Sequence, residues 1–213
     1  MNEFLIIIFQ LVVFLFSVMI HEVAHGAVAL KLGDTTAKDA GRLTLNPLKH
    51  LDFFGSILLP LSLYIISQGS FILGWAKPVP YNPYNLKNPK KGAGLIAAAG
   101  PLTNITIAVI FGILIRIAGI FPINEFVGML LLMFNIVVFV NVLLAIFNLL
   151  PLPPLDGSGI LFSLLPEKWS MVRQWLQRYG FYLLFFFIFF GFQLIIPVIM
   201  FLYRLIVGSA SVL

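Results

Sequence analysis

Long apolar segments dominate this chain and limit what it can fold into. Residues 4–32 form an apolar run longer than the roughly 20 residues that a helix needs to cross a bilayer. Similar runs cover residues 94–119, 126–150 and 181–207. Because 61% of the 213 residues are hydrophobic and only 10% are charged, the chain cannot cover a water-facing surface. The sequence therefore predicts an integral membrane protein and excludes a soluble enzyme, a coiled coil and a disordered chain.

A weaker apolar segment covers residues 53–73, where Pro60 and the Ser-Gln-Gly-Ser sequence at 67–70 interrupt it. Three prolines within residues 74–83 then favour extended or turn backbone. We expect residues 53–85 to enter the membrane and return to the same side, as a helix followed by an extended arm. The predicted fold is an all-α polytopic membrane protein with four to six transmembrane helices and this re-entrant segment.

The chain has no repeat and no low-complexity tail, so we expect a single membrane domain over residues 1–213. Its core covers residues 4–165, in which 94–119 and 126–150 form a helical hairpin. In residues 166–180, Arg and Lys mixed with Trp and Leu indicate a helix lying in the membrane interface. A Phe-rich span follows at 181–207, where Pro197 is expected to kink the helix or split it in two.

Residues 21–25 read His-Glu-Val-Ala-His inside the first apolar run. A spacing of four residues places His21 and His25 on one face of a helix, where both imidazoles can bind one zinc ion. Glu22 lies beside them, where a carboxylate can accept a proton from the attacking water. Ionisable groups inside a membrane segment are costly and are usually functional, which favours a zinc site over a chance match.

A catalytic zinc needs a third protein ligand, and without cysteine that ligand must be a His or a carboxylate. Asp156 is the preferred candidate because it follows a proline-rich break next to an apolar span and precedes Gly157. The alternative role for Asp156 is to cap a helix that starts near Ser158, and the two roles are compatible. The remaining acids lie mostly among polar residues, where solvated charges are the simpler interpretation.

These motifs together resemble the site-2 proteases, the intramembrane zinc metalloproteases of peptidase family M50. The resemblance rests on His21-Glu-x-x-His25 and on Asn148-x-x-Pro-x-Pro-x-Leu-Asp156-Gly. The sequences Gly-Trp-Ala-Lys-Pro-Val-Pro at 74–80 and Ala-Gly-Pro-Leu-Thr-Asn at 99–104 are similar to the compact prokaryotic branch, which lacks PDZ and CBS domains. The resemblance covers residues 4–165, whereas the C-terminal span matches in hydropathy only.

The resemblance implies that His21, His25 and Asp156 bind one Zn²⁺ and that Glu22 is the general base and later the acid. It also implies that Asn148 hydrogen-bonds the substrate backbone or the developing oxyanion, and that Asn104 helps to position the substrate. An amide donor can stabilise an oxyanion where water is scarce. For Asn104, and for Asn135 and Asn141, the simpler interpretation is a hydrogen bond between neighbouring membrane helices.

Charges and zinc geometry predict the same topology. Ligands of one zinc ion must lie at similar depth, so the number of crossings between His25 and Asp156 must be even, as it is if residues 53–85 return. Of the 13 Lys and Arg residues, 11 then lie on the side of the loop that follows His25, and only Arg116 and Arg204 lie on the far side. The positive-inside rule then predicts a multi-pass protein of the cell membrane, with its N-terminus outside and its active site toward the cytoplasm.

The predicted function is hydrolysis of peptide bonds within or near transmembrane segments of membrane proteins. The expected partners are a transmembrane protein or peptide substrate and the lipid bilayer, and no nucleic acid is expected. Two alternatives remain: a metal-binding or metal-transporting membrane protein, and an inactive relative that binds transmembrane helices. His50 and Asp52 match the family pattern but receive no predicted role, and the sequence gives neither the substrate nor the oligomeric state.

Overall fold

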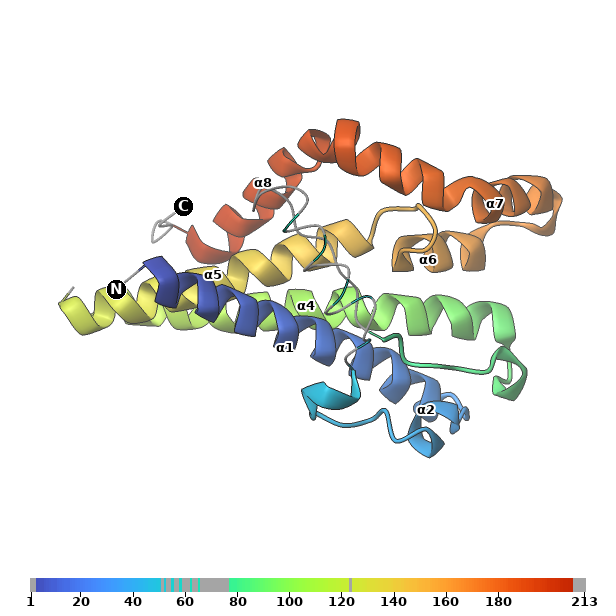
Figure 1. Cartoon of the computed structure of the whole chain (residues 1–213), viewed down its shortest axis with the longest axis horizontal. Coiled ribbons are helices and arrows are strands. Elements are labelled where there is room, and N and C mark those ends of the chain that lie inside the picture. The colour runs from blue at the N-terminus through green and yellow to red at the C-terminus, as the bar shows by residue number, and fades with distance from the viewer. Residues whose placement is uncertain are drawn as a thin grey trace.

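The structure is a computed structural model that describes residues 3–50, 77–122 and 124–208, together with residues 52, 55, 58, 62 and 65. This described part of the chain is helical and contains no strand, which confirms the predicted all-α membrane fold (Figure 1). The helices are α1 (Glu3–Lys31), α2 (Thr36–Asp39), α4 (Pro89–Ala118), α5 (Glu125–Asn148), α6 (Asp156–Leu164), α7 (Ser170–Phe186) and α8 (Ile196–Val207). Most of the expected re-entrant segment at 53–73 lies outside the described residues.

Four helical segments of the described part are long and apolar enough to cross a membrane. They are Glu3–Lys31, Pro89–Ala118, Glu125–Asn148 and Glu167–Leu194. Their apolar side chains are largely exposed, as for Phe4, Ile7 and Leu11 on α1. Lipid would cover such a surface and water would not, so the chain is a membrane protein.

Helices α4 and α5 form the expected antiparallel hairpin, and α1 packs along both of them. Each hairpin helix begins at an asparagine cap: the Asn88 side chain accepts the Lys91 backbone N–H, and that of Asn124 accepts the Val127 N–H. These caps satisfy backbone donors that the first helical turn leaves unpaired. Because Asn88 caps α4 and Pro89 suits its first turn, the helix starts five residues before the apolar run.

The C-terminal part differs from the expected arrangement. The structure has no separate interfacial helix ending at residue 180, because α7 continues to Phe186 and packs Gly180 closely against Pro153. The helical path is instead irregular at 187–195, with a π-helical segment followed by a 3-10 turn. Pro197 lies in the first turn of α8, so the predicted split of this span is confirmed. The short α8 packs against α4 and α5.

Residues 77–88 lie beside the C-terminal end of α1. Leu86 packs in a buried cluster with Ala29 of α1 and Ile96 of α4. The Asp34 carboxylate accepts hydrogen bonds from the Asn82 backbone N–H at 2.8 Å and the Asn85 side chain at 2.7 Å. The C-terminal end of α1 and the N-terminal end of α4 therefore lie at the same end of the bundle (Figure 1), as the even number of crossings requires.

Asp34 binds residues 82–85 through an ionised carboxylate. Burial alone would raise the pKa of Asp34, but hydrogen bonds from Thr36, Asn82 and Asn85 outweigh burial and lower this pKa from 3.8 to about 2. The carboxylate is fully buried and makes these contacts with both of its oxygen atoms. Asp34 thus fixes residues 77–88, here called the arm, against α1.

Candidate active site and metal centre

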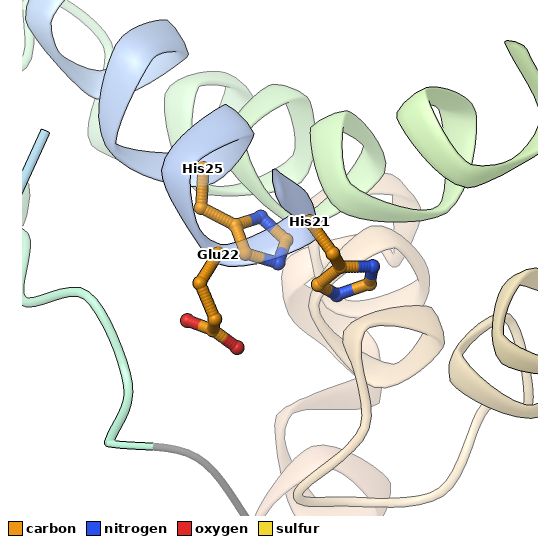
Figure 2. A group of neighbouring side chains, drawn as sticks. All are labelled: His21, Glu22 and His25. Carbon is orange, nitrogen blue, oxygen red and sulfur yellow. The ribbon is translucent and has the colours of Figure 1, made fainter. Parts of the chain in front are cut away.

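Helix α1 carries the three residues of the His-Glu-x-x-His motif near its C-terminal half. Figure 2 shows that the side chains of His21, Glu22 and His25 extend into the same region, with the two rings next to each other. The ring centroids of His21 and His25 are 4.7 Å apart, and both residues are buried. One ligand atom from each of the three residues falls within 4.8 Å of the others.

Asp156, from the start of α6, joins these histidines across 131 residues of sequence. Its Oδ2 atom is 2.9 Å from His21 Nε2 and 3.3 Å from His25 Nε2. Among the described residues, no backbone N–H of α6 donates to this oxygen, so it does not act as a helix cap. The fold therefore brings a carboxylate to the two imidazoles.

Hydrogen bonds on the far side of each ring fix which imidazole nitrogen carries the proton when the ring is neutral. His25 Nδ1 lies 2.6 Å from the backbone oxygen of Ile96, an acceptor only, so this nitrogen must carry the proton. His21 Nδ1 lies 2.8 Å from Asn104 Oδ1, which the same reasoning assigns as an acceptor. In neutral rings both Nε2 atoms then present lone pairs, and a carboxylate oxygen meets them. Three converging acceptors without a proton fit a bound cation.

Space for such an ion depends on a glycine of α4. A Cβ atom added at Gly100 would lie 2.4 Å from His21 Nε2 and 2.6 Å from His25 Nε2. The bare backbone of α4 thus borders the converging nitrogens, and any side chain there would collide with them. Two imidazoles and a carboxylate are ligands that zinc commonly takes, so the residues present fit a zinc ion.

The Glu22 carboxylate lies beside the candidate metal ligands and is held by the arm. Its Oε2 atom accepts a hydrogen bond from the Val79 backbone N–H at 3.0 Å. Val79 also packs over Gly26, one turn further along α1, where an added Cβ would lie 2.8 Å from the valine side chain. The arm is therefore fixed to α1 at Glu22 and Gly26 and, beyond the end of α1, to Asp34.

The two predicted asparagines take different positions. Asn148, at the end of α5, is half-buried, lines the cavity at the site and donates one N–H to the Leu144 backbone oxygen at 2.9 Å. Asn104 is fully buried and does not line that cavity. Its Nδ2 donates to Asn141 Oδ1, and Asn141 Nδ2 in turn donates to Ser17 Oγ at 2.9 Å. A chain of polar side chains therefore connects α1, α5 and α4 and ends at the His21 ring.

A cavity of about 320 Å³ opens at these residues. It is lined on one side by α1 and the arm, and on the other side by α4, the end of α5 and the start of α6. Its polar lining residues are His21, Glu22, His25, Tyr81, Asn148, Asp156 and Ser158. The candidate ligands, the candidate base and Asn148 thus all face one space that can admit a small segment of another molecule.

Other polar residues singled out in the sequence lie elsewhere. Buried His50 places its Nε2 at 2.9 Å from the Thr44 backbone oxygen, while its own backbone oxygen accepts the Lys77 N–H. Asp52 accepts the Gly55 N–H at 2.7 Å. Neither residue lines the cavity. Asn135 pairs with Tyr203 of α8 and thus makes the cross-helix bond expected of such a residue.

Sequence reasoning missed several residues that shape the site. Gly100, the Ile96 carbonyl and Asp34 received no role, although each supports the geometry described above. Gly100 belongs to the Ala-Gly-Pro-Leu-Thr-Asn motif, which was a usable signal. The contacts of the Ile96 backbone oxygen and of Asp34 depend on tertiary packing, which no local pattern reveals.

Comparison with known proteins places the chain in a family. The model of "Peptidase family M50" matches residues 116–191. "Putative zinc metalloprotease YwhC" of Bacillus subtilis is 39% identical over 168 residues, which cover 78% of this chain and 73% of that protein. "Putative zinc metalloprotease MJ0611" of Methanocaldococcus jannaschii is 31% identical over 184 residues, which cover 83% and 84% of the two chains.

A third relative, "Putative zinc metalloprotease Rip2" of Mycolicibacterium smegmatis, is 30% identical over 173 residues, covering 78% of this chain and 61% of that protein. No solved structure matches the chain significantly. The family match covers α5, α6 and α7, and the relatives extend the similarity over more than three quarters of the chain. The chain therefore belongs to peptidase family M50.

Proposed function

We propose that this protein is a zinc metalloprotease that cuts peptide bonds within or next to transmembrane segments of other membrane proteins. The observation that carries the proposal is the meeting of His21 Nε2, His25 Nε2 and Asp156 Oδ2, with N···O distances of 2.9 and 3.3 Å, beside the Glu22 carboxylate. This set lies in a cavity of a membrane helix bundle. Membership of peptidase family M50 supports proteolysis as the reaction. The relatives named as zinc metalloproteases support zinc as the metal.

In this proposal each residue of the site has a separate chemical role. His21, His25 and Asp156 would hold the ion, which lowers the pKa of water and polarises the carbonyl that is attacked. Glu22 would accept the proton of the attacking water and later give it to the leaving amine. Asn148 has a second side-chain N–H that is not used by Leu144, and this N–H can stabilise the developing oxyanion.

The buried Asn104 acts through a ligand in this proposal. Its side-chain oxygen fixes the orientation and the proton position of the His21 ring, as partners of metal-bound histidines generally do. This role differs from the direct positioning of substrate that the resemblance implies for Asn104. The buried position of Asn104, outside the cavity lining, supports the indirect role.

The substrate segment must be unwound before it is cut, because a helix shields its own peptide bonds. The extended residues 77–82 line one side of the cavity and offer backbone groups that an unwound segment could pair with. The positive-inside rule further places the site toward the cytoplasm and the N-terminus outside. We propose a multi-pass protein of the cell membrane with this orientation.

The test measures bound zinc and cleavage together on detergent-purified protein. Wild type, Asp156→Ala, Glu22→Gln and the exposed control Asp39→Ala are compared after removal of loosely bound metal. We expect about one zinc per chain in wild type, Glu22→Gln and the control, and almost none in Asp156→Ala. A set of single-span peptides should be cut by wild type and by the control only.

Each alternative gives a different result. Full zinc in Asp156→Ala would remove Asp156 from the ligand set and contradict the proposed site. Cleavage by Glu22→Gln at the wild-type rate would contradict the role of Glu22 as the base. Zinc in wild type without cleavage of any peptide would favour a metal-binding protein or an inactive relative.

A further inference from the structure

A second cavity adjoins the candidate active site. It has a volume of about 390 Å³ and lies among the arm, the N-terminal end of α4, α6 and the first turns of α7. Three of its lining residues, Tyr81, Ala93 and Gly159, also line the first cavity. The two cavities therefore border each other at the active site.

Two of the three residues at the border between the cavities are small, and the third is Tyr81 of the arm. Ala93 on α4 has only a methyl group, and Gly159 on α6 has no side chain. A Cβ atom added at Gly159 would lie 2.9 Å from the Cβ of Ala97, so α4 and α6 approach closely there. No bulky side chain of either helix separates the two spaces, and an extended peptide could continue from one into the other.

The second cavity carries an uncompensated positive charge. Lys90 donates to the Leu165 backbone oxygen at 2.6 Å and pairs with Glu167 at 3.1 Å, so its charge is matched. Arg173 of α7 also lines the cavity, and its guanidinium carbon lies 5.6 Å from the centre of the Phe162 ring. Within the described part of the chain, no carboxylate lies within ion-pair distance of Arg173.

A guanidinium that packs over an aromatic ring keeps its N–H edge free for a planar carboxylate. We propose that the second cavity binds the part of the substrate next to the cleaved bond and that Arg173 recognises an Asp or Glu side chain there. This inference rests on the proposed protease function. The shared border with the active site favours a peptide over a lipid, because a peptide in the first cavity must continue beyond it.

We expect Arg173 to change the affinity for the substrate and not the rate of the chemical step. Arg173 contacts none of the candidate catalytic residues in the first cavity, and it is exposed enough for water to screen its charge. We therefore expect a preference for acidic flanks of about two- to fivefold in KM, with kcat unchanged. A role that only supports α7 would instead affect all peptides equally.

The experiment uses single-span peptides of identical apolar sequence, flanked on either side by Asp, Asn or Lys, in neutral detergent. Binding is measured on Glu22→Gln protein and cleavage on protein with an intact Glu22, each with Arg173, Arg173→Gln or Arg173→Glu. Arg178→Gln is the matched control, because Arg178 lies on the same helix over Tyr179 and does not line the cavity. We expect an Asp-flanked peptide to bind best, the preference to vanish in Arg173→Gln and to shift toward Lys in Arg173→Glu.

The outcomes separate the inference from the proposed function. Cleavage of all peptides with equal KM would overturn the role of Arg173 and leave the protease intact. Failure of the wild type to cut any peptide, despite bound zinc, would contradict the protease itself. If short-chain phosphatidylglycerol binds in an Arg173-dependent way and the peptides show no charge preference, the cavity is a lipid phosphate site and the inference is wrong.

Discussion

At the scale of single residues, the hydrogen bonds of the Nδ1 atoms of His21 and His25 determine how each ring presents its Nε2 atom to a metal ion. The Ile96 backbone oxygen and the Asn104 side-chain oxygen each accept a hydrogen bond from the Nδ1–H of one ring, so that in neutral rings both Nε2 atoms are available as ligands. A backbone carbonyl cannot be removed by substitution, but Asn104 can. The contribution of the Nδ1 hydrogen bond to zinc affinity can therefore be measured at His21.

Replacing Asn104 by Ala should weaken zinc binding about 10- to 100-fold, because His21 loses the partner that fixes its ring. Asn104→Asp keeps an acceptor for the His21 Nδ1 proton and should retain most of the affinity. Zinc affinity is measured by competition with a chelator in detergent. Asn135→Ala is the control, since Asn135 is an equally buried asparagine that contacts Tyr203 and not the site. Equal zinc affinity in Asn104→Ala and wild type would contradict this role.

At the scale of helices, the site depends on how closely α4 approaches α1. The backbone of α4 at Gly100 borders the metal ligands, and Leu86 of the arm packs against Gly92 near the start of the same helix. Close approach of membrane helices is favoured by small residues, since apolar side chains gain little from leaving lipid. Gly100 thus leaves the space beside the candidate ligands.

Gly100→Ala should abolish zinc binding while the helices still form, because its Cβ would occupy the space at both Nε2 atoms. Gly128→Ala on α5 is the matched control, since an added Cβ there meets nothing within 4 Å. Zinc per chain and helix content by circular dichroism are measured for both variants. Normal zinc content in Gly100→Ala would show that the ligands can move away from α4.

The arm depends on Asp34 in the same way. Asp34→Ala should lower the free energy of unfolding by about 2 to 4 kcal/mol, because buried donors of Thr36, Asn82 and Asn85 lose a charged acceptor. Since the pKa of Asp34 is about 2 in the folded protein and 3.8 ordinarily, this stabilisation is complete above about pH 4 and is lost as pH falls toward 2. Thermal unfolding in detergent at pH 7 and pH 3 checks both statements. The exposed Asp39→Ala variant should unfold like wild type.

At the scale of the whole molecule, the sequence predicts much of the fold because the spans are long and uniform. Apolar runs locate the ends of α1, α4 and α5 to within five residues, and the need for one zinc site predicts that the chain returns before α4. The boundary expected at residue 180 is wrong, since the charged and Phe-rich parts join in α7 and packing at Gly180 decides the path. Ile96, Gly100 and Asp34 support the site through contacts between segments that are far apart in the sequence. Local sequence patterns cannot reveal such contacts.

The overall orientation can be tested because the chain contains no cysteine. Lys91→Cys and Ile120→Cys place single thiols at the two ends of α4. If the side with the metal site faces the cytoplasm, a membrane-impermeant maleimide should label Ile120→Cys in intact cells and Lys91→Cys only after permeabilisation. The reverse pattern would place the active site outside the cell.

The chain of polar contacts from Ser17 through Asn141 and Asn104 to His21 also decides when the metal site forms. These bonds, with that of Asp34 to the arm, are made between protein groups alone. The ligands are thus preorganised by helix packing, unlike in a zinc finger, whose fold requires its metal. We therefore expect the zinc-free protein to remain a folded helix bundle, and zinc to raise its stability only through mass action. Removing the metal should switch off the activity and leave the architecture in place.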